Sequence, residues 1–199
     1  RALAARRFDT VLALALLTLG LTTSGAIFAV ADALLINPAP FPQSDRLVQV
    51  WSTVRESSIM SMPRELAPHW LDRTDLFSSG GAYTQTTALI MGAGDPELLG
   101  AAEVSPGLLE TLGVRPILGR TFAAEEGAPG ANHVVLIGAE VWASKFGGSP
   151  DVLGRVLRIN NIDYAVIGVM PSTFRFPFSR QRVWFPLDLR SAPSGNQTR

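Results

Sequence analysis

The side chains that most often perform acid–base or metal chemistry are few in this sequence and lie far apart. Its two histidines, His69 and His133, belong to no metal-ligand spacing, and we expect each to be a surface or packing residue. Glu125 and Glu126 are of the type used in general acid–base catalysis, but neighbouring side chains rarely converge on one substrate. Small residues flank this pair, so we interpret it as part of a solvated loop. These residues predict neither a catalytic site nor a metal site.

Nucleotide and acyl-transfer chemistry lack their usual residues as well. The sequence has no G-x-x-x-x-G-K-S/T loop, and its only lysine, Lys145, lies in Ser-Lys-Phe-Gly-Gly. It has no G-x-S-x-G elbow of the kind that carries a nucleophilic serine. Because the chain has no cysteine, thiolate nucleophiles, thiolate metal ligands and disulfides are excluded. We therefore expect a protein that is not an enzyme and holds no cofactor.

Arginines are the one ionisable group that recurs in short segments next to glycine. Arg115 and Arg120 flank residues 116–119, and Arg155 and Arg158 follow Gly154. Such groups can bind an anion, but pairing with nearby acids is the interpretation we favour. Lys+Arg and Asp+Glu both total 17, so the net charge is zero and predicts no nucleic-acid partner.

The elements that would position these residues are short and mixed. The tryptophans fall one per predicted element, which is typical of core anchors; they are Trp51, Trp70, Trp142 and Trp184. Apolar runs predict strands at 47–51, 81–91, 98–104, 134–137, 156–159, 162–169 and 183–187. Helices are predicted at 66–71, 106–112 and 139–146, with a loop at 57–63 and a turn at 92–96. The absence of a regular βαβα alternation favours an α+β fold.

Two of these elements carry clear local signals. Ser105 is a candidate N-cap for the second helix, Pro106 suits its first position, and Gly113 can end it. Asn160 and Asn161 join two strands, and asparagine tolerates the positive φ values that a two-residue hairpin needs.

The amino-terminal segment has a different character from the rest of the chain. Residues 10–31 form an uncharged apolar run of 22 residues, against roughly 20 needed to cross a bilayer. We predict a transmembrane helix over 10–35, and the arginines at 1, 6 and 7 place residues 1–9 in the cytoplasm. A cleaved signal peptide is the main alternative, because Ala29-Val30-Ala31 is a fair cleavage site. A buried core helix is a weaker alternative.

The chain after this segment is predicted to be one extracytoplasmic domain with a short tail. Prolines in residues 37–42 enforce an extended exit from the helix. The domain is predicted over residues 36–190, and residues 191–199 are polar enough to be a tail or linker.

Four stretches together resemble a known family. They are residues 28–48, with Pro38-Ala39-Pro40-Phe41-Pro42; residues 106–122, with Leu112-Gly113-Val114-Arg115-Pro116; residues 134–148; and residues 152–187, with Ile167-Gly168-Val169-Met170-Pro171 and Trp184-Phe185-Pro186-Leu187. In this order the chain resembles the periplasmic core domain of MacB-like ABC transporter permeases, especially the large permease group described from acidobacteria. The likeness covers nearly the whole chain.

This resemblance implies a permease component of the bacterial inner membrane, with the amino terminus in the cytoplasm and the main domain in the periplasm. Members carry three further membrane helices near the carboxyl end and pair with a separate or fused ATPase. The domain would couple ATPase-driven conformational change to the handling of substrates or partners outside the membrane. Membrane lipid is an expected contact, and a homodimer or paired permease and a periplasmic adaptor are partners that the resemblance allows. The alternative function is a secreted or membrane-anchored binding domain that takes no part in transport.

Overall fold

The computed structural model describes residues 10–11, 14–25, 41–42, 44–54, 58–60, 62–91, 95–130 and 133–189. The chain divides into two compact units, Arg1–Asp45 and Arg46–Arg199. The predicted turn at 92–96 falls largely outside these residues, as do the predicted cytoplasmic segment 1–9 and the tail 191–199.

The first unit contains a helix over residues 14–25. Its threonines satisfy their hydroxyls locally: Thr18, Thr22 and Thr23 each donate to a carbonyl one turn back, at 2.7–2.9 Å. Among the described residues, no helix is both long enough and apolar enough to cross a membrane. The predicted span over 10–35 includes residues 26–35, which lie outside the described residues, so the span stays a prediction.

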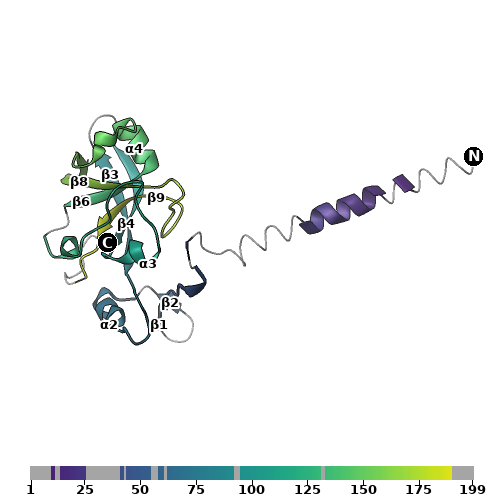
Figure 1. Ribbon diagram of the computed structural model, residues 1–199, viewed down its shortest axis with the longest axis horizontal. Coiled ribbons are helices and arrows are strands. Elements are labelled where there is room, and N and C mark those ends of the chain that lie inside the picture. Colours follow the sequence, from purple (N-terminus) through teal and green to yellow (C-terminus); the bar gives the residue numbers. More distant parts are fainter. Residues whose placement is uncertain are drawn as a thin grey trace, which may run out of the picture. The chain divides into compact units, whose positions relative to one another are not determined.

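The second unit is built on a mixed sheet that closes on itself (Figure 1). Its strands are β3 (Tyr83–Met91), β4 (Glu97–Val104), β5 (Leu118–Gly119), β6 (Val134–Gly138), β7 (Val156–Ile159), β8 (Ile162–Met170) and β9 (Gln181–Pro186). They run in the order β5-β8-β6-β9-β4-β3-β7, and β7 also pairs with β8, which completes the ring. The pairs β4–β9 and β6–β8 are parallel and the others antiparallel. With its few short helices, this arrangement confirms the predicted α+β class.

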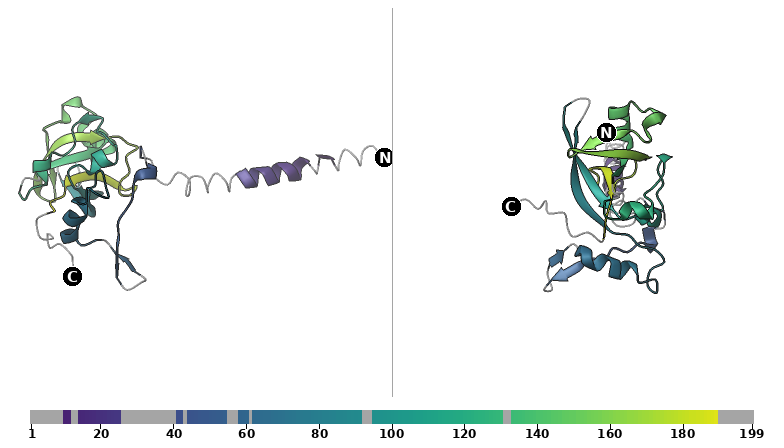
Figure 2. Two further views of the ribbon diagram at one scale, coloured as in Figure 1. Left: turned by 60° about the horizontal axis from the view of Figure 1, so that its bottom comes forward. Right: turned by 90° about the vertical axis from the view of Figure 1, so that its left-hand side faces the viewer.

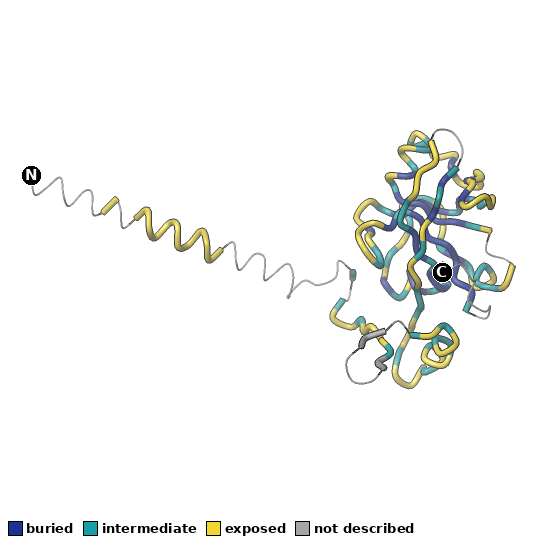
Figure 3. The backbone as a smooth tube through the Cα atoms, turned by 180° about the vertical axis from the view of Figure 1, so that it is seen from behind, coloured by how far each residue is buried: buried dark blue, intermediate teal, exposed yellow. Residues whose placement is uncertain are grey.

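The core lies inside this closed sheet (Figure 3). Alternate residues of the strands point inward. In β7, Leu157 and Ile159 are buried, whereas Val156 and Arg158 are exposed. The inward side chains form one apolar cluster: Ala88, Ile90, Ala101, Val135, Ile137, Val141, Val152, Leu157, Ile159, Val166, Val169, Val183 and Phe185. The predicted strands 81–91, 98–104, 134–137, 156–159, 162–169 and 183–187 all lie in this sheet, so these predictions are confirmed. The two-residue β5 had no sequence signal.

Helix α4 (Ala139–Phe146) confirms its predicted bounds. It follows β6 directly, packs against β6 and β8, and places Val141 in the core. Gly147 ends the helix with φ +61°, a left-handed conformation that glycine adopts without strain. A 3₁₀ turn, η5 (Pro150–Val152), then leads into β7.

Helix α3 (Leu108–Thr111) is shorter than the predicted helix over 106–112. Leu108, Leu109 and Leu112 are buried as the apolar stripe required, and Gly113 ends the helix at φ +68°. The predicted N-cap is wrong. The Ser105 hydroxyl instead accepts a hydrogen bond from the Ala82 amide at 2.9 Å. This bond joins the residue before β3 to the residue after β4. Gly107, at φ +87°, takes the cap position.

The hairpin turn between β7 and β8 confirms the asparagine prediction and adds a second role. Asn160 and Asn161 have φ values of +51° and +67°. Asn160 also reaches β3: its Oδ1 accepts from the Leu89 amide at 2.9 Å, and its Nδ2 donates to the Thr87 carbonyl at 3.3 Å. Strands β3 and β7 share only the residue pairs Ile90–Ile159 and Met91–Arg158. The hydrogen bonds of Asn160 therefore extend the contact between these two strands, which we call the seam because the ring closes there.

We call the closed sheet the barrel. The described residues between 46 and 77 form a small lobe beside it. After η2 (Ser44–Arg46) come β1 (Ser52–Val54), β2 (Ser58–Met60), η3 (Arg64–Leu66) and α2 (Ala67–Leu71). Helix α2 confirms the predicted helix at 66–71. The predicted strand at 47–51 is wrong, because these residues pair with no described strand and β1 begins only at Ser52. The predicted loop at 57–63 is also wrong, since β2 lies within it and pairs with β1.

Candidate functional site

The fold does not bring the sequence-predicted ionisable residues together. His69 is exposed on α2, whereas His133 stands before β6 with its ring 6.2 Å from that of Tyr164. Among the described residues no three His, Asp or Glu side chains are grouped so as to hold a metal ion. Burial, and then the negative charge of Glu103, raise the pKa of Tyr164. Arg64 pairs with Glu103 at 3.2 Å, so this corner holds an ion pair near the half-buried Tyr164 phenol.

The carboxylate pair Glu125–Glu126 lies in the 3₁₀ turn η4 (Ala124–Gly127) rather than in a loop. The Glu126 carboxylate receives both guanidinium nitrogens of Arg120, at 2.7 and 2.8 Å, and the Ala123 amide at 2.8 Å. Hydrogen bonding from Arg120 lowers the pKa of Glu126, and the same contact raises the pKa of Arg120. The predicted pairing of Arg120 is thus confirmed. Glu126 also caps η4, because its carboxylate accepts from the amide of the N-cap residue Ala123.

The other arginines of the two predicted segments differ from one another. Arg158 lies 3.8 Å from the Asp163 carboxylate and also donates to the Asn161 side chain at 3.1 Å, which confirms its pairing. Arg155 stacks over the Phe146 ring at 5.4 Å, a cation–π contact that the sequence did not signal. The pairing expected of Arg115 is not found among the described residues. The single lysine, Lys145, lies 2.8 Å from Glu97 and ties α4 to the start of β4.

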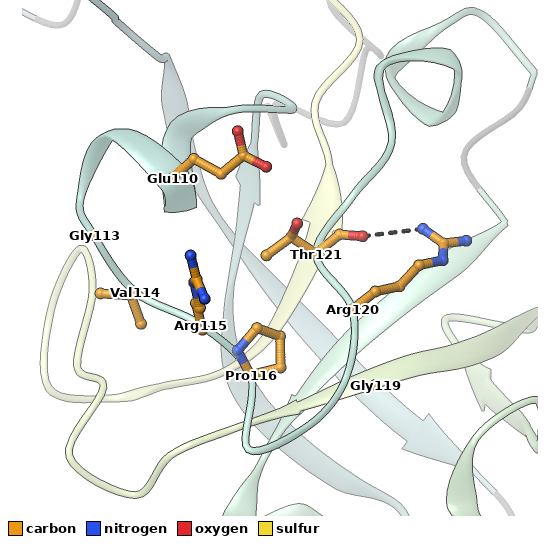
Figure 4. A pocket seen from close by; sticks show the side chains of 8 residues that line it. All are labelled: Glu110, Gly113, Val114, Arg115, Pro116, Gly119, Arg120 and Thr121. Atoms are coloured by element: carbon orange, nitrogen blue, oxygen red, sulfur yellow. Dashed lines mark hydrogen bonds between the residues drawn. The ribbon is translucent and has the colours of Figure 1, made fainter.

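A solvent-open hollow of about 630 Å³ surrounds Arg115 (Figure 4). Its wall comes from the end of α3 and from the segment that leads through β5: Glu110, Gly113, Val114, Arg115, Pro116, Gly119, Arg120 and Thr121. The Arg120 guanidinium turns away and donates to the Thr121 carbonyl at 3.0 Å. Glu110 and Arg115 bring opposite charges to one shallow surface, and both are exposed. Anion binding by Arg115 stays a hypothesis.

The tryptophans divide into two groups. Trp184 is buried and donates to the Phe176 carbonyl at 2.8 Å, and the half-buried Trp142 donates to the Ser149 carbonyl at 2.7 Å. Both match the predicted core anchors. Trp51 and Trp70 are 46% and 37% exposed, so that prediction is wrong for the lobe. We call the large exposed apolar residues of this lobe the lobe surface: Val48, Val50, Trp51, Leu66, Trp70 and Leu76.

Among the described residues of the lobe none is buried (Figure 3), and polar contacts join the lobe to the barrel. Arg64 donates to the Asp188 carbonyl at 3.3 Å in addition to its pairing with Glu103. The Gln49 amide donates to the Tyr83 hydroxyl, and burial raises the pKa of Tyr83. The side chains of the lobe surface are exposed in the described part of the chain, and an exposed apolar patch is typical of an interaction site.

A comparison with known families decides what kind of domain this is. The model of the MacB-like periplasmic core domain matches residues 10–198. The chain belongs to the MacB-like periplasmic core domain family. The resemblance drawn from the four sequence stretches is therefore confirmed.

Solved structures place this MacB-like domain among similar folds. The extracellular domain of the noncanonic ABC-type transporter YknZ from Gram-positive bacteria is 15% identical with a TM-score of 0.50, over 61% of this chain and 60% of that chain. The periplasmic region of MacB from Actinobacillus actinomycetemcomitans is 14% identical with a TM-score of 0.45, over 55% and 48%. The chain thus spans about half to three fifths of the structures it matches. No curated protein matches it.

Two features of this MacB-like domain are available for function: the hollow around Arg115 and the lobe surface. The hollow presents charges of both signs and no buried polar group, unlike the deep apolar pockets that hold small molecules. The lobe surface presents aromatic and aliphatic side chains, which are the usual centre of a protein contact. Sequence reasoning missed this surface because it assigned both lobe tryptophans to a core.

Proposed function

We propose that this chain is the extracytoplasmic domain, with the first membrane helix, of an inner-membrane ABC transporter permease. The observation that carries the proposal is the family match over residues 10–198, which includes both the apolar amino-terminal run and the barrel. The apolar run of residues 10–31 would anchor the chain, with residues 1–9 in the cytoplasm and the domain in the periplasm. ATP hydrolysis would take place on a separate nucleotide-binding subunit or domain.

The domain would act by moving as a body and presenting its surface to substrates or partners. A closed sheet around one packed core is stiff, because close-packed interiors transmit displacement rather than absorb it. Rigid-body rotation of a domain about an interface is one of the common structural transitions of regulated proteins. A membrane helix joined to the lobe would carry this motion, and a paired permease or a periplasmic adaptor would receive it.

Cysteine labelling tests the topology, using the cysteine-free background of the chain. Single cysteines replace Ala4 or Leu98 in the full-length gene; Leu98 is 66% exposed on β4. Cells with a permeabilised outer membrane are treated with a membrane-impermeant maleimide and then fractionated. We expect Leu98→Cys to be labelled and Ala4→Cys to be protected, both on one membrane-bound chain. A soluble product that carries position 98 and has lost position 4 would instead show a cleaved signal peptide.

Distance measurements test the coupling. Spin labels at Leu98 and Val156 report on one barrel, since both side chains are exposed and lie on β4 and β7. A label at Leu98 alone reports on the distance between two domains in an assembled permease. Trapping the copurified ATPase with ATP and vanadate should move the second distance and leave the first unchanged. Constant distances in both experiments would contradict the coupling while leaving the topology intact.

A further inference from the structure

Two opposite charges face the hollow around Arg115 without being paired within the described part of the chain. Glu110 and Arg115 both line the hollow, and both are exposed. Neither side chain belongs to an ion pair between described residues, whereas Arg120, the third charged group of the wall, is bound to Glu126. The Glu110 carboxylate and the Arg115 guanidinium are therefore the two charges that a ligand in the hollow would meet.

The side chains of the wall point toward one space. Figure 4 shows the Glu110 carboxylate, the Arg115 guanidinium and the Thr121 hydroxyl around the same opening, with the Arg120 guanidinium turned away. Arg120 is held in that direction by its hydrogen bonds to the Glu126 carboxylate and to the Thr121 carbonyl, at 2.7–3.0 Å. The hollow thus presents an acidic acceptor on one side and a basic donor with a hydroxyl on the other.

The backbone that carries Arg115 is fixed on both sides. The Val114 amide donates to the Leu109 carbonyl at 2.9 Å, which ties the segment to α3. The Ile117 amide donates to the Val169 carbonyl at 2.8 Å, which ties it to β8. A ligand would therefore find the basic side of the hollow already formed, and preorganisation of this kind lowers the cost of binding.

The acidic side of the hollow is fixed as well. Glu110 lies on α3, whose Leu108 and Leu109 are buried, and the helix lies beside the closed sheet (Figure 2). Pro116 lies between the two sides and disfavours helical backbone at Arg115, so α3 does not continue into the segment. The spacing of the two charges is thus set by the fold, although each side chain can still change rotamer.

The types of these residues define the ligand that they suit. A guanidinium binds the oxygens of a carboxylate or a phosphate through paired N–H donors, and a threonine hydroxyl can supply one more donor. A carboxylate attracts an ammonium and repels an anion. A simple anion at Arg115 would be opposed by Glu110, and a simple cation at Glu110 would be opposed by Arg115. A molecule with both charges is opposed by neither.

We propose that the hollow binds a small zwitterion, in which a carboxylate or phosphate and an ammonium lie a few bonds apart. The acidic oxygens accept from Arg115 and from the Thr121 hydroxyl, and the ammonium donates to Glu110. A volume of about 630 Å³ is within the range of small-molecule sites and larger than a single ion needs. Because the charges are exposed, we expect a Kd on the order of 1 mM that rises with salt. A free amino acid and the phosphoethanolamine head group of a lipid share this chemistry.

Titration with γ-aminobutyrate and with phosphoethanolamine tests the site and distinguishes these sources. The isotope-labelled full chain is kept in mild detergent, and the amide NMR shifts of Gly113, Gly119 and Thr121 follow binding. Butyrate, butylamine and inorganic phosphate each carry one of the two charges and should bind several-fold more weakly. Saturable shifts with γ-aminobutyrate alone would assign an amino acid, and with phosphoethanolamine alone a lipid head group. The absence of saturable shifts with both, or equal affinity for butyrate and γ-aminobutyrate and for phosphate and phosphoethanolamine, would overturn the proposal.

Two substitutions test the charges separately, and both side chains are exposed, so the fold is preserved. Arg115→Gln should weaken binding of the preferred zwitterion about five-fold, as the loss of one exposed charge pair predicts. Glu110→Gln should weaken the same zwitterion by a similar factor but strengthen binding of butyrate, because the repulsion is removed. Glu125→Gln is the matched control, since Glu125 is exposed on η4 and does not line the hollow.

The sign of the Glu110 effect decides between a zwitterion and a plain anion. If Glu110→Gln strengthened binding of the zwitterion as well, the hollow would be a simple anion site and the proposal would fail. The same would follow if Glu125→Gln had as large an effect as Glu110→Gln, because the response would then reflect only the net charge of the chain. The site does not depend on the proposed function, and the labelling of positions 4 and 98 is independent of these titrations.

Discussion

Glu126 shows how a candidate catalytic residue becomes a structural one once its neighbours are known. Its side chain is only 14% exposed and accepts from Arg120 and from the Ala123 amide. Glu125, one residue away, is exposed. The sequence alone could not separate these two carboxylates, because the difference depends on Arg120, which precedes the turn.

Replacing Glu126 with Gln should lower the stability of the domain by about 1 kcal/mol, the typical worth of hydrogen bonds to a charged group at a half-open site. Because the pKa of Glu126 is lowered in the folded state, its contribution is present above the unfolded pKa of about 4.3. It is lost as the pH falls through the lower folded value. Urea unfolding at pH 7 and pH 3 should show the difference between wild type and variant shrinking at the lower pH. Glu125→Gln is the matched control, and an equal loss there would contradict the assignment.

Asn160 and Asn161 share a backbone conformation but differ in what their side chains do. Gly suits both positions because both φ values are positive. Asn160→Gly removes two hydrogen bonds to β3, whereas Asn161→Gly removes one contact to the exposed Arg158. We expect Asn160→Gly to be less stable than Asn161→Gly by about 1–2 kcal/mol, at about 1 kcal/mol for each hydrogen bond. Thermal unfolding of the two variants measures this, and equal stabilities would show that the seam does not need the side chain.

At the scale of elements, the sequence predicted those whose signals are local. Helix α4 lies between its strand and a glycine pair, and the β7–β8 hairpin is specified by its asparagines, so both match closely. One strand without a local signal was missed. Strand β5 exists because Ile117 and Arg120 bond to Val169 and Ile167, and nothing within residues 116–121 indicates this. Residues 47–51 are the opposite case. Their pattern predicted a strand, but they pair with no strand among the described residues.

Gly119 tests how closely β5 must approach β8. A Cβ at Gly119 would lie 2.2 Å from the Ile167 carbonyl oxygen, whereas a Cβ at Gly154 would have no neighbouring atom within 4 Å. The two glycines have nearly the same positive φ, +81° and +79°. Gly154→Ala should therefore cost only the conformational penalty, about 1–2 kcal/mol. Gly119→Ala should cost about 1–3 kcal/mol more, because backbone must move to relieve the overlap. Denaturant unfolding of both variants measures the difference, and equal costs would show that β5 yields freely.

At the scale of the whole molecule, the sequence predicted the fold class and, through four ordered stretches, the family. It did not predict the closed ring. Closure depends on β7 pairing with both β3 and β8, and on parallel pairs between strands far apart in the chain, such as β4 and β9. Apolar alternation shows which face of a strand is buried but not which strand lies beside it. The lobe surface was not predicted either. Whether a tryptophan is buried or exposed depends on the residues that pack around it, and the sequence does not show which residues these are.

Hydrogen exchange should distinguish the barrel from the lobe. Strands β6 and β9 lie in the middle of the sheet and have neighbours on both sides, so their amides should exchange slowly in a dilute detergent solution of the chain. The amides of residues 47–51 have no backbone partner among the described residues and should exchange fast. Protection of 47–51 in dilute solution would contradict this expectation, because it would show that the segment is paired within its own chain.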